Sequence, residues 1–463
     1  MRGKDAGSPD SGTIGATEDA ASCRPARRGG SVVIVKQAPS RPRAVVVVTG
    51  SELVRGERTD LNGPFLASEA LRLGLEPARI AIVGDNPEEL EAALRDALEG
   101  ADAVLVSGGL GPTHDDRTVE FVAKALGVGL HVDAELETQI ESVSRAAAER
   151  LRRDYADFAP GVTKQATVPD GAVSLGLAGT APGLIVPRED GRLVVVLPGP
   201  PGELKRLWPN ALETPAFQAL LARTSPPGRR VLRLFGVSES AVARALADAG
   251  GDGDGVEVTI CARDFEIHVD LVVQPGAEAH ADELEVAFTA PLEQWLYGRD
   301  ERGVEEHVLE SCRARGLTLA TAESCSGGLV AARLTSVPGS SDVVLGGIVA
   351  YSNGVKEAEL GVPAELIAAH GAVSAEVAEA MARGARERLG ADVAVSVTGV
   401  AGPGGGTPEK PVGLVYVHAE GPDGGLGREL NFPGDRASIR ARSVVMALHL
   451  TRTLLTRSLD EGA

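Results

Sequence analysis

Between residues 44 and 126, apolar and polar positions alternate in blocks that match strands and helices in turn. Residues 44–49 form a continuous apolar run, which is typical of a strand buried on both faces of a parallel sheet. Further extended runs are predicted at 79–83 and 103–107. Helical periodicity is found at residues 62–73, 88–98 and 118–126. This βαβ rhythm predicts an α/β fold in which helices are layered on a sheet.

Polar residues and glycines gather where these predicted strands end. Ligands of such sheets bind beyond the carboxyl ends of the strands, so we expect a site there. Asp115 and Asp116 could share a hard cation with a substrate pyrophosphate, although both also suit the N-cap of the helix that follows. The candidate substrate and metal residues are Glu52, Asp60, Gly108, Gly109, Asp115 and Asp116, with the metal assigned to Asp115 and Asp116.

A second candidate site lies in the last third of the chain, where a strand-like run at 317–322 is followed by Ser324 and two glycines, Gly327 and Gly328. Apolar residues then recur at helical spacing. Ser324 therefore falls at a strand-to-helix turn, where unpaired backbone N–H groups could hold an oxyanion or a phosphate. The alternative is a simple helix cap, a position that serine favours.

Two later segments add chemistry to this turn. Tyr351 and Lys356 lie close together after an apolar strand-like run, and a desolvated lysine assisted by a tyrosine can activate a serine without a histidine. Thr398 opens a glycine-rich segment, 398–406, after another strand-like run, and its glycines allow backbone to approach a ligand closely. Either segment alone would be read as a surface charge or a mobile loop.

Residues 216–300 read as a small connecting α+β domain. Strands are predicted at 231–235 and 266–273 and a helix at 238–247. His268 falls in a strand pattern with no second His or Cys at metal-ligand spacing, so we expect it to be a packed or surface residue.

Charge and composition narrow the function classes. The chain has 463 residues, enough for about three domains, with 43% hydrophobic and 24% charged residues. A net charge of −19 argues against broad nucleic-acid binding, which needs a basic face. Four unpaired cysteines, no signal-peptide pattern and no apolar run of membrane length predict a soluble cytoplasmic protein. Residues 1–40 read as a disordered tail or as the product of a mis-assigned start codon.

Five motifs together resemble the C-terminal domain of the CinA family over residues 303–458. They are T-A-E-S-C-S-G-G (321–328), Y-S-N-G-V-K (351–356), G-A-V-S (371–374), T-G-V-A-G-P-G-G-G (398–406) and E-K-P-V-G (409–413). Stand-alone relatives of that domain are nicotinamide mononucleotide deamidases, so the resemblance implies amidohydrolase chemistry without a cofactor. Ser326 stands where the family usually has threonine, which keeps the hydroxyl.

The resemblance also implies roles for single residues. Ser324 matches the family's nucleophile, and Tyr351 and Lys356 match its proton-transfer partners. N–H groups near residues 325–328 would stabilise the oxyanion. The expected substrate-binding residues are Thr398, Gly327, Gly328, Gly402, Gly404, Gly405, Arg436 and Arg440.

Six further motifs resemble the N-terminal CinA domain over residues 42–215. They are G-S-E-L-V-R-G (50–56), T-D-L-N (59–62), S-G-G-L-G-P-T-H-D-D (107–116), K-Q-A (164–166), G-T-A-P-G (179–183) and L-P-G-P-P-G-E-L (197–204). That domain is similar to molybdopterin-binding proteins, which implies a three-layer fold, and some members are ADP-ribose pyrophosphatases that use a divalent cation, Mg or Co. Ser51 replaces the commoner aspartate, and Gly176 stands where an asparagine usually precedes G-T-A-P-G.

The leading hypothesis is therefore a hydrolase of pyridine-nucleotide salvage that acts on small nucleotides and forms a homodimer, as the family resemblance implies. A pterin-binding enzyme and a non-catalytic regulatory partner in competence or DNA damage response stay open as alternatives. Residues 303–458 would carry the deamidase and residues 42–215 the second activity.

Overall fold

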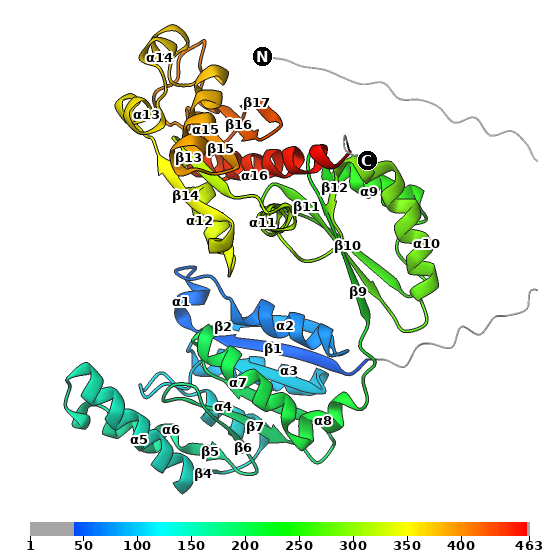
Figure 1. Ribbon diagram of the computed structural model, residues 1–463. Helices are drawn as coiled ribbons and strands as arrows, with labels where there is room; N and C mark the ends of the chain where they lie inside the picture. The colour runs from blue at the N-terminus through cyan, green and yellow to red at the C-terminus, as the bar shows by residue number, and fades with distance from the viewer. Residues whose placement is uncertain (1–40, 461–463) are drawn as a thin grey trace, which may run out of the picture. The chain divides into compact units, whose positions relative to one another are not determined.

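The computed structural model describes residues 41–460, and its strands form three main sheets with helices packed against them (Figure 1). A short two-stranded pair, β4 (Leu130–Val132) and β5 (Thr167–Pro169), accompanies the first sheet. The predicted tail, residues 1–40, lies outside the described residues. Within residues 41–460, no helix combines the length and apolarity that crossing a bilayer requires.

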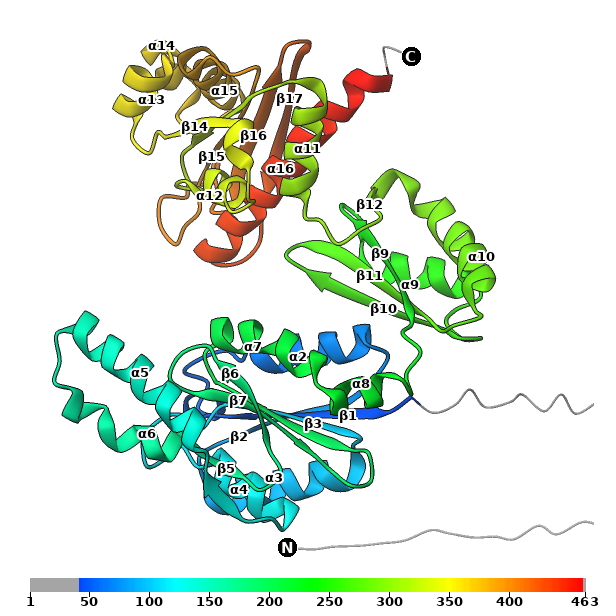
Figure 2. The same cartoon turned by 60° about the horizontal axis from the view of Figure 1, so that its bottom comes forward.

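The first sheet has the strand order β2-β1-β3-β8-β7-β6. Figure 2 shows this sheet lying between two layers of helices. Its first four strands are mutually parallel, whereas β7 and β6 are antiparallel to their neighbours. The strands are β1 (Arg43–Thr49), β2 (Glu76–Val83), β3 (Ala103–Ser107), β6 (Val173–Leu177), β7 (Pro182–Pro187) and β8 (Leu193–Leu197).

Helices cover both faces of this sheet because the apolar residues of β1 alternate between two cores. Val46 packs in the core that includes helix residues Leu66, Leu204 and Phe217, whereas Val47 packs in the opposite core. The fold class predicted for this domain is thereby confirmed as three layers. The helices are α1 (Ser51–Val54), α2 (Asn62–Arg72), α3 (Pro87–Gly100), α4 (Thr118–Leu126), α5 (Ala134–Leu151), η1 (Tyr155–Asp157), α6 (Ala159–Gln165), α7 (Pro201–Glu213) and α8 (Pro215–Leu221).

The second sheet is antiparallel throughout, in the order β10-β11-β9-β12, and two helices share its apolar core. The predicted strands and helix are present, but the sequence analysis missed β10, α10 and β12. The elements are β9 (Gly228–Leu234), α9 (Glu239–Asp248), β10 (Val256–Arg263), β11 (Glu266–Val273), α10 (Glu278–Thr289), η2 (Ala290–Trp295) and β12 (Leu296–Gly298).

The third sheet has the order β14-β13-β15-β16-β17, with β14, β13 and β15 parallel and the last two strands antiparallel. Its strands are β13 (Leu319–Glu323), β14 (Val344–Val349), β15 (Val393–Gly399), β16 (Leu414–Gly421) and β17 (Gly424–Asn431). Helices α11 (Val304–Arg315), α12 (Leu329–Thr335) and α16 (Arg436–Asp460) contribute to one core, and α13 (Asn353–Leu360), α14 (Ala364–His370) and α15 (Ala375–Leu389) to the other. A short turn, η3 (Ser340–Asp342), precedes β14.

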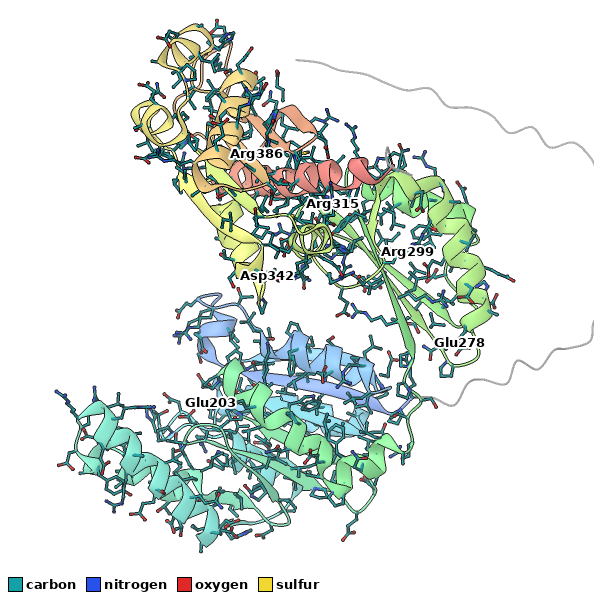
Figure 3. All side chains as sticks on the ribbon, in the orientation of Figure 1. Glu203, Glu278, Arg299, Arg315, Asp342 and Arg386 are labelled. Carbon is teal, nitrogen blue, oxygen red and sulfur yellow. The ribbon has the colours of Figure 1, made fainter. Side chains whose placement is uncertain are left out.

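Side-chain hydrogen bonds tie α11 to α16 and α15 to the end of β16. Arg315 of α11 donates to the carbonyl of Leu455, and Arg386 of α15 donates to the carbonyl of Gly421; Figure 3 labels both arginines. The register pairs Glu323 with both Val349 and Val397, so the carboxyl ends of the three parallel strands meet at one edge. The segments that follow these strands therefore converge.

Candidate active site

The segments after β13 and β14 bring Ser324 and Lys356 together. Nζ of Lys356 lies 3.1 Å from Oγ of Ser324 and donates a 2.7 Å hydrogen bond to the carbonyl of Ala350. Lys356 is only 1% exposed, and no carboxylate among the described residues forms an ion pair with it. Burial therefore lowers the pKa of Lys356, because the charged ammonium is desolvated. This pair is a serine hydroxyl next to an amine that gives up its proton more easily than an ordinary lysine.

The turn that carries Ser324 depends on two glycines in left-handed conformations. Strand β13 ends at Glu323 and α12 begins at Leu329, and between them Gly327 has φ 62° and Gly328 has φ 94°. Residues with a Cβ rarely adopt these values, so the reversal requires glycine. The N–H of Ser324 donates to the carbonyl of Val397 at 2.8 Å, which anchors the turn to β15.

The N–H groups at the end of this turn already have acceptors within the protein. Gly327 donates to the carbonyl of Ser324, and Gly328 donates to the carboxylate of Glu323 at 2.9 Å. The N–H groups of Gly327 and Gly328, two residues that we expected at the substrate, are therefore engaged within the protein. The N–H groups of Cys325 and Ser326 donate to no backbone carbonyl within residues 41–460, and both lie within hydrogen-bonding reach of the Cys325 thiol.

Tyr351 lies beside the site, and within the described residues its hydroxyl forms no hydrogen bond with Lys356. Its side chain is 61% exposed, and its hydroxyl accepts a 2.9 Å hydrogen bond from Arg436. The other terminal nitrogen of Arg436 donates to the carbonyl of Gly402 at 2.7 Å. The structure thus places Tyr351 at the rim of the site, bridged by Arg436 to the glycine-rich loop.

Arg440 also binds the turn that carries Ser324. Its guanidinium donates to the carbonyl of Cys325 at 3.1 Å and to the carbonyl of Ser326 at 2.8 Å. With these carbonyls turned toward Arg440, the turn has a fixed backbone conformation. Arg436 and Arg440 both project from the first turns of α16, and both bind protein carbonyls here.

Thr398 is fully buried, and its hydroxyl donates to the carbonyl of Ala372 at 2.8 Å. It therefore organises the 371–374 segment. Lys410, which the sequence analysis did not single out, donates to the carbonyls of His370 and Val373 and holds the same segment. The N–H groups of Gly402, Gly404 and Gly405 have no acceptor among the described residues, so this loop keeps donors for an anionic group.

The candidate residues of the first sheet lie around the 107–116 loop. Asp60 accepts from the N–H groups of Asn62 and Gly63, and Asp116 accepts from both the N–H and the hydroxyl of Thr113. Asp115 is 63% exposed and lies 3.0 Å from the ring of His114. Two of the predicted carboxylates thus shape their own loops.

The carboxylates predicted to hold a metal are Asp115 and Asp116. Within residues 41–460, no group of three or more His, Cys, Asp or Glu side chains is arranged to hold a metal ion. Mg²⁺ is usually held by only one or two carboxylates together with water and substrate phosphates, so the metal stays a prediction. We derive no step through it.

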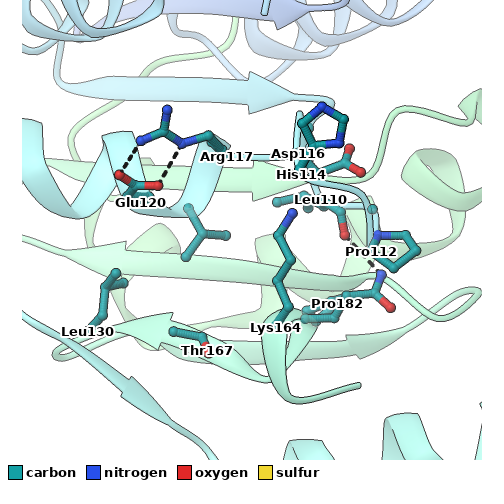
Figure 4. Close-up of a pocket in the computed structure, with 14 residues that line it drawn as sticks. Leu110, Pro112, His114, Asp116, Arg117, Glu120, Leu130, Lys164, Thr167 and Pro182 are labelled. Carbon is teal, nitrogen blue, oxygen red and sulfur yellow. Dashed lines mark hydrogen bonds and ion pairs between the residues drawn. The ribbon is translucent and has the colours of Figure 1, made fainter. Parts of the chain in front are cut away.

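Two cavities flank the 107–116 loop. One, of about 580 Å³, is lined by Glu52, Asp60, Asn62, Ser107 and Gly199 among others. The other, of about 500 Å³, is lined by apolar residues such as Leu110 and Pro112 together with Asp116, Lys164 and Gln165 (Figure 4). The sequence analysis quoted the K-Q-A motif but did not place Lys164 and Gln165 in a site.

Buried polar atoms without partners surround the first glycines of this loop. Three buried side-chain oxygens form no hydrogen bond within the described chain: Oγ1 of Thr49, Oδ1 of Asn62 and Oγ1 of Thr118. A Cβ on Gly109 would lie 2.1 Å from the Thr118 hydroxyl oxygen and 3.2 Å from that of Thr49. Glycine at 109 is thus required for the loop to approach both hydroxyls.

Three family models match consecutive parts of the chain. Residues 45–218 match a model described as "Probable molybdopterin binding domain", residues 229–298 match "Damage-inducible protein CinA KH domain", and residues 301–455 match "CinA C-terminal domain". The middle match shows that the connecting region is similar to a KH domain, which the sequence analysis did not predict.

Full-length relatives cover nearly the same extent. A CinA-like protein of Mycolicibacterium paratuberculosis is 45% identical over 90% of this chain and 99% of its own length, and one of Mycolicibacterium gilvum is 46% identical over 89% and 99%. Among solved structures, a competence/damage inducible protein from Agrobacterium tumefaciens is 43% identical and covers 34% of this chain and 97% of its own, with a TM-score of 0.32. On the strength of the full-length relatives, the chain belongs to the CinA family.

Proposed function

We propose that the chain is an amidohydrolase that converts nicotinamide mononucleotide to nicotinic acid mononucleotide and ammonia. The observation that carries this proposal is the 3.1 Å separation between Oγ of Ser324 and Nζ of Lys356, a buried amine without an acidic partner. Such a pair suits acyl transfer from an amide, because the neutral amine can take the hydroxyl proton as the serine attacks.

The reaction proceeds in two halves. Oγ of Ser324 forms a bond to the carboxamide carbon, and its proton passes to Nζ of Lys356. The C–N bond then breaks, and the proton returns from Lys356 to the departing nitrogen, which leaves as ammonia. Water adds to the acyl-enzyme in the same manner and releases the carboxylate and the serine.

Backbone donors complete the chemistry at each end of the substrate. The N–H groups of Cys325 and Ser326 adjoin the nucleophile and supply the oxyanion donors, a contribution typically worth about 10²- to 10³-fold in kcat per donor. The free N–H groups of Gly402, Gly404 and Gly405 suit the 5′-phosphate, since an acidic chain needs local donors to bind an anion. Tyr351 and Arg436 stand at the rim between the two.

Ammonia release from nicotinamide mononucleotide tests the proposal directly. We expect purified wild-type protein to release ammonia and Ser324→Ala to lose turnover by orders of magnitude while keeping its melting temperature. Wild-type rates from Ser324→Ala would overturn the assignment of the nucleophile. Absence of ammonia release from the folded wild-type protein would overturn the proposed substrate.

A second function is favoured by the buried polar atoms around the 107–116 loop. We propose that the cavities beside Asn62 and Lys164 bind a phosphate-bearing nucleotide or a pterin, because Thr49 and Asn62, which line the first of them, leave polar atoms unpartnered. Incubation with ADP-ribose and Mg²⁺ or Co²⁺ tests the catalytic version. AMP release above that of Asp115→Ala would show a pyrophosphatase, whereas no AMP would leave a binding module. A regulatory, non-catalytic role would follow only if both assays failed.

A further inference from the structure

Glu323 is the residue before the proposed nucleophile, and its buried carboxylate has an unusual set of partners. The side chain is 1% exposed and accepts hydrogen bonds from three backbone N–H groups of α12 and the turn before it: Gly328 at 2.9 Å, Val330 at 3.0 Å and Ala331 at 2.9 Å. The hydroxyl of Thr321 lies 3.4 Å away. A buried carboxylate is thus satisfied almost wholly by the start of one helix.

This is not ordinary helix capping. A capping side chain normally belongs to the residue just before the helix, but here that residue is Gly328, which has no side chain to offer. The acceptor comes instead from the end of β13, across the whole catalytic turn. Glu323 therefore ties the end of β13 to the beginning of α12 and closes the loop that contains Ser324.

The backbone of Glu323 connects the same point to the lysine. Its carbonyl accepts a 2.8 Å hydrogen bond from the N–H of Ala350, and the carbonyl of Ala350 accepts from Nζ of Lys356 at 2.7 Å. The side chain of Glu323 thus fixes the serine turn, and its main chain fixes the segment on which Lys356 rests. One residue links the two groups that must meet at 3.1 Å.

We propose that Glu323 is a positioning residue for the reaction: it sets the approach of Ser324 to Lys356. The inference rests on the proposed function for its link to turnover. Because the Glu323 carboxylate occupies the N–H groups of Gly328, Val330 and Ala331, these three groups are not available to the substrate.

A matched pair of variants tests this role. Glu323→Gln keeps the shape but puts an NH₂ group against N–H donors. Glu306→Gln makes the same change at a glutamate that accepts from the N–H of Gly303 at 2.8 Å to cap α11, away from the turn. We expect Glu323→Gln to lower kcat at least tenfold with KM changed less than twofold, and Glu306→Gln to leave both constants unchanged even if its melting temperature falls.

A second readout separates this inference from the choice of substrate. Phenylmethanesulfonyl fluoride needs only a reactive serine: Oγ bonds to sulfur, the S–F bond breaks, and the serine proton leaves through the base. We expect Ser324 to be labelled at least tenfold more slowly in folded Glu323→Gln than in wild type. If wild-type protein is labelled but releases no ammonia, the proposed substrate is wrong and the positioning role of Glu323 is still supported.

Equal labelling rates and equal kcat in wild type and Glu323→Gln would overturn the positioning role, provided that hydrogen exchange shows faster exchange at Gly328, Val330 and Ala331. If Glu323→Gln does not fold, Glu323→Asp, which keeps the charge but shortens the reach, takes its place in both assays. Wild-type values from the folded aspartate variant would likewise overturn the role.

Discussion

The hydroxyl of Tyr351 accepts a 2.9 Å hydrogen bond from Arg436, and it lies at the exposed rim of the candidate active site. A tyrosine in this position orients Arg436 toward the glycine-rich loop, whereas a proton relay would need to touch Lys356. We therefore expect Tyr351→Phe to raise KM for the mononucleotide several-fold and to change kcat less than about tenfold, below the usual range for a general acid or base. Steady-state kinetics measure the separate effects on KM and kcat. A loss of kcat comparable to that of Ser324→Ala would show that Tyr351 does act in proton transfer.

We expect removal of the proposed base, Lys356, to have a larger effect on kcat than removal of the Tyr351 hydroxyl. Lys356→Met keeps most of the buried aliphatic volume but removes the amine, so kcat should fall by about 10²- to 10⁴-fold. Loss of the buried amine should not unfold the protein, since a buried lysine without an acidic partner is costly to desolvate. Circular dichroism and ammonia release check the two halves of this prediction. Unimpaired turnover by a folded Lys356→Met protein would place the base elsewhere.

The pH dependence follows from the direction of the lysine pKa. Burial lowers the pKa of Lys356 below its ordinary value of 10.5, and only the neutral amine can accept the serine proton. The rate constant kcat/KM should therefore rise with pH through the lowered pKa and reach its plateau below pH 10.5. The unfolded chain binds this proton more tightly, so the free energy of unfolding should also rise with pH over the interval between the lowered pKa and 10.5. An activity that falls with pH across this interval would contradict the assignment.

Cys325 adjoins the nucleophile but should be inert. Burial raises the pKa of its thiol to about 11, so little thiolate is present near neutral pH. Cys261 is exposed. Mass spectrometry after iodoacetamide treatment at pH 7.5 should find Cys261 modified and Cys325 intact, with ammonia release unchanged. Rapid alkylation of Cys325 in the folded protein would show that the turn opens.

Two glycines form a matched test of packing in the third sheet's helical layer. A Cβ on Gly384 of α15 would lie 1.8 Å from the carbonyl oxygen of Leu360, whereas a Cβ on Gly354 of α13 would meet nothing within 4 Å. We expect Gly384→Ala to destabilise the protein by about 1–3 kcal/mol or more, as overpacking does, and Gly354→Ala to be neutral or stabilising by about 0.5–1 kcal/mol. Urea unfolding measures both, and equal effects would show that the helices can separate at no cost.

The local pattern of apolar residues predicted the elements well where that pattern is pronounced. The apolar run at 44–49 became β1, and the helix predicted at 118–126 is α4. By contrast, α10 was missed, and its residues include several acidic side chains that obscure the apolar positions. Sequence periodicity identifies a helix because one of its faces is apolar and buried. It therefore does not identify helices that are only weakly amphipathic.

The site was predictable to the extent that its residues lie in short motifs. Ser324 and Lys356 could be paired from their motifs, and the structure brings them into contact. The roles of Glu323 and Arg440 could not be read locally. A glutamate at a strand end has no signature of capping a helix beyond the next turn, and Arg440 reaches carbonyls that lie 114 and 115 positions earlier. Such contacts depend on tertiary packing.

The two arginines at the start of α16 have a consequence for the order of assembly. Arg436 and Arg440 immobilise a loop and a turn that were synthesised long before them, so those segments lack their bracing until this helix docks. A nascent or truncated chain that ends before residue 436 would contain Ser324 and Lys356. It would lack the arginine hydrogen bonds that fix the turn and the loop around them. The arrangement needed for catalysis would then form late in folding, when these long-range contacts close.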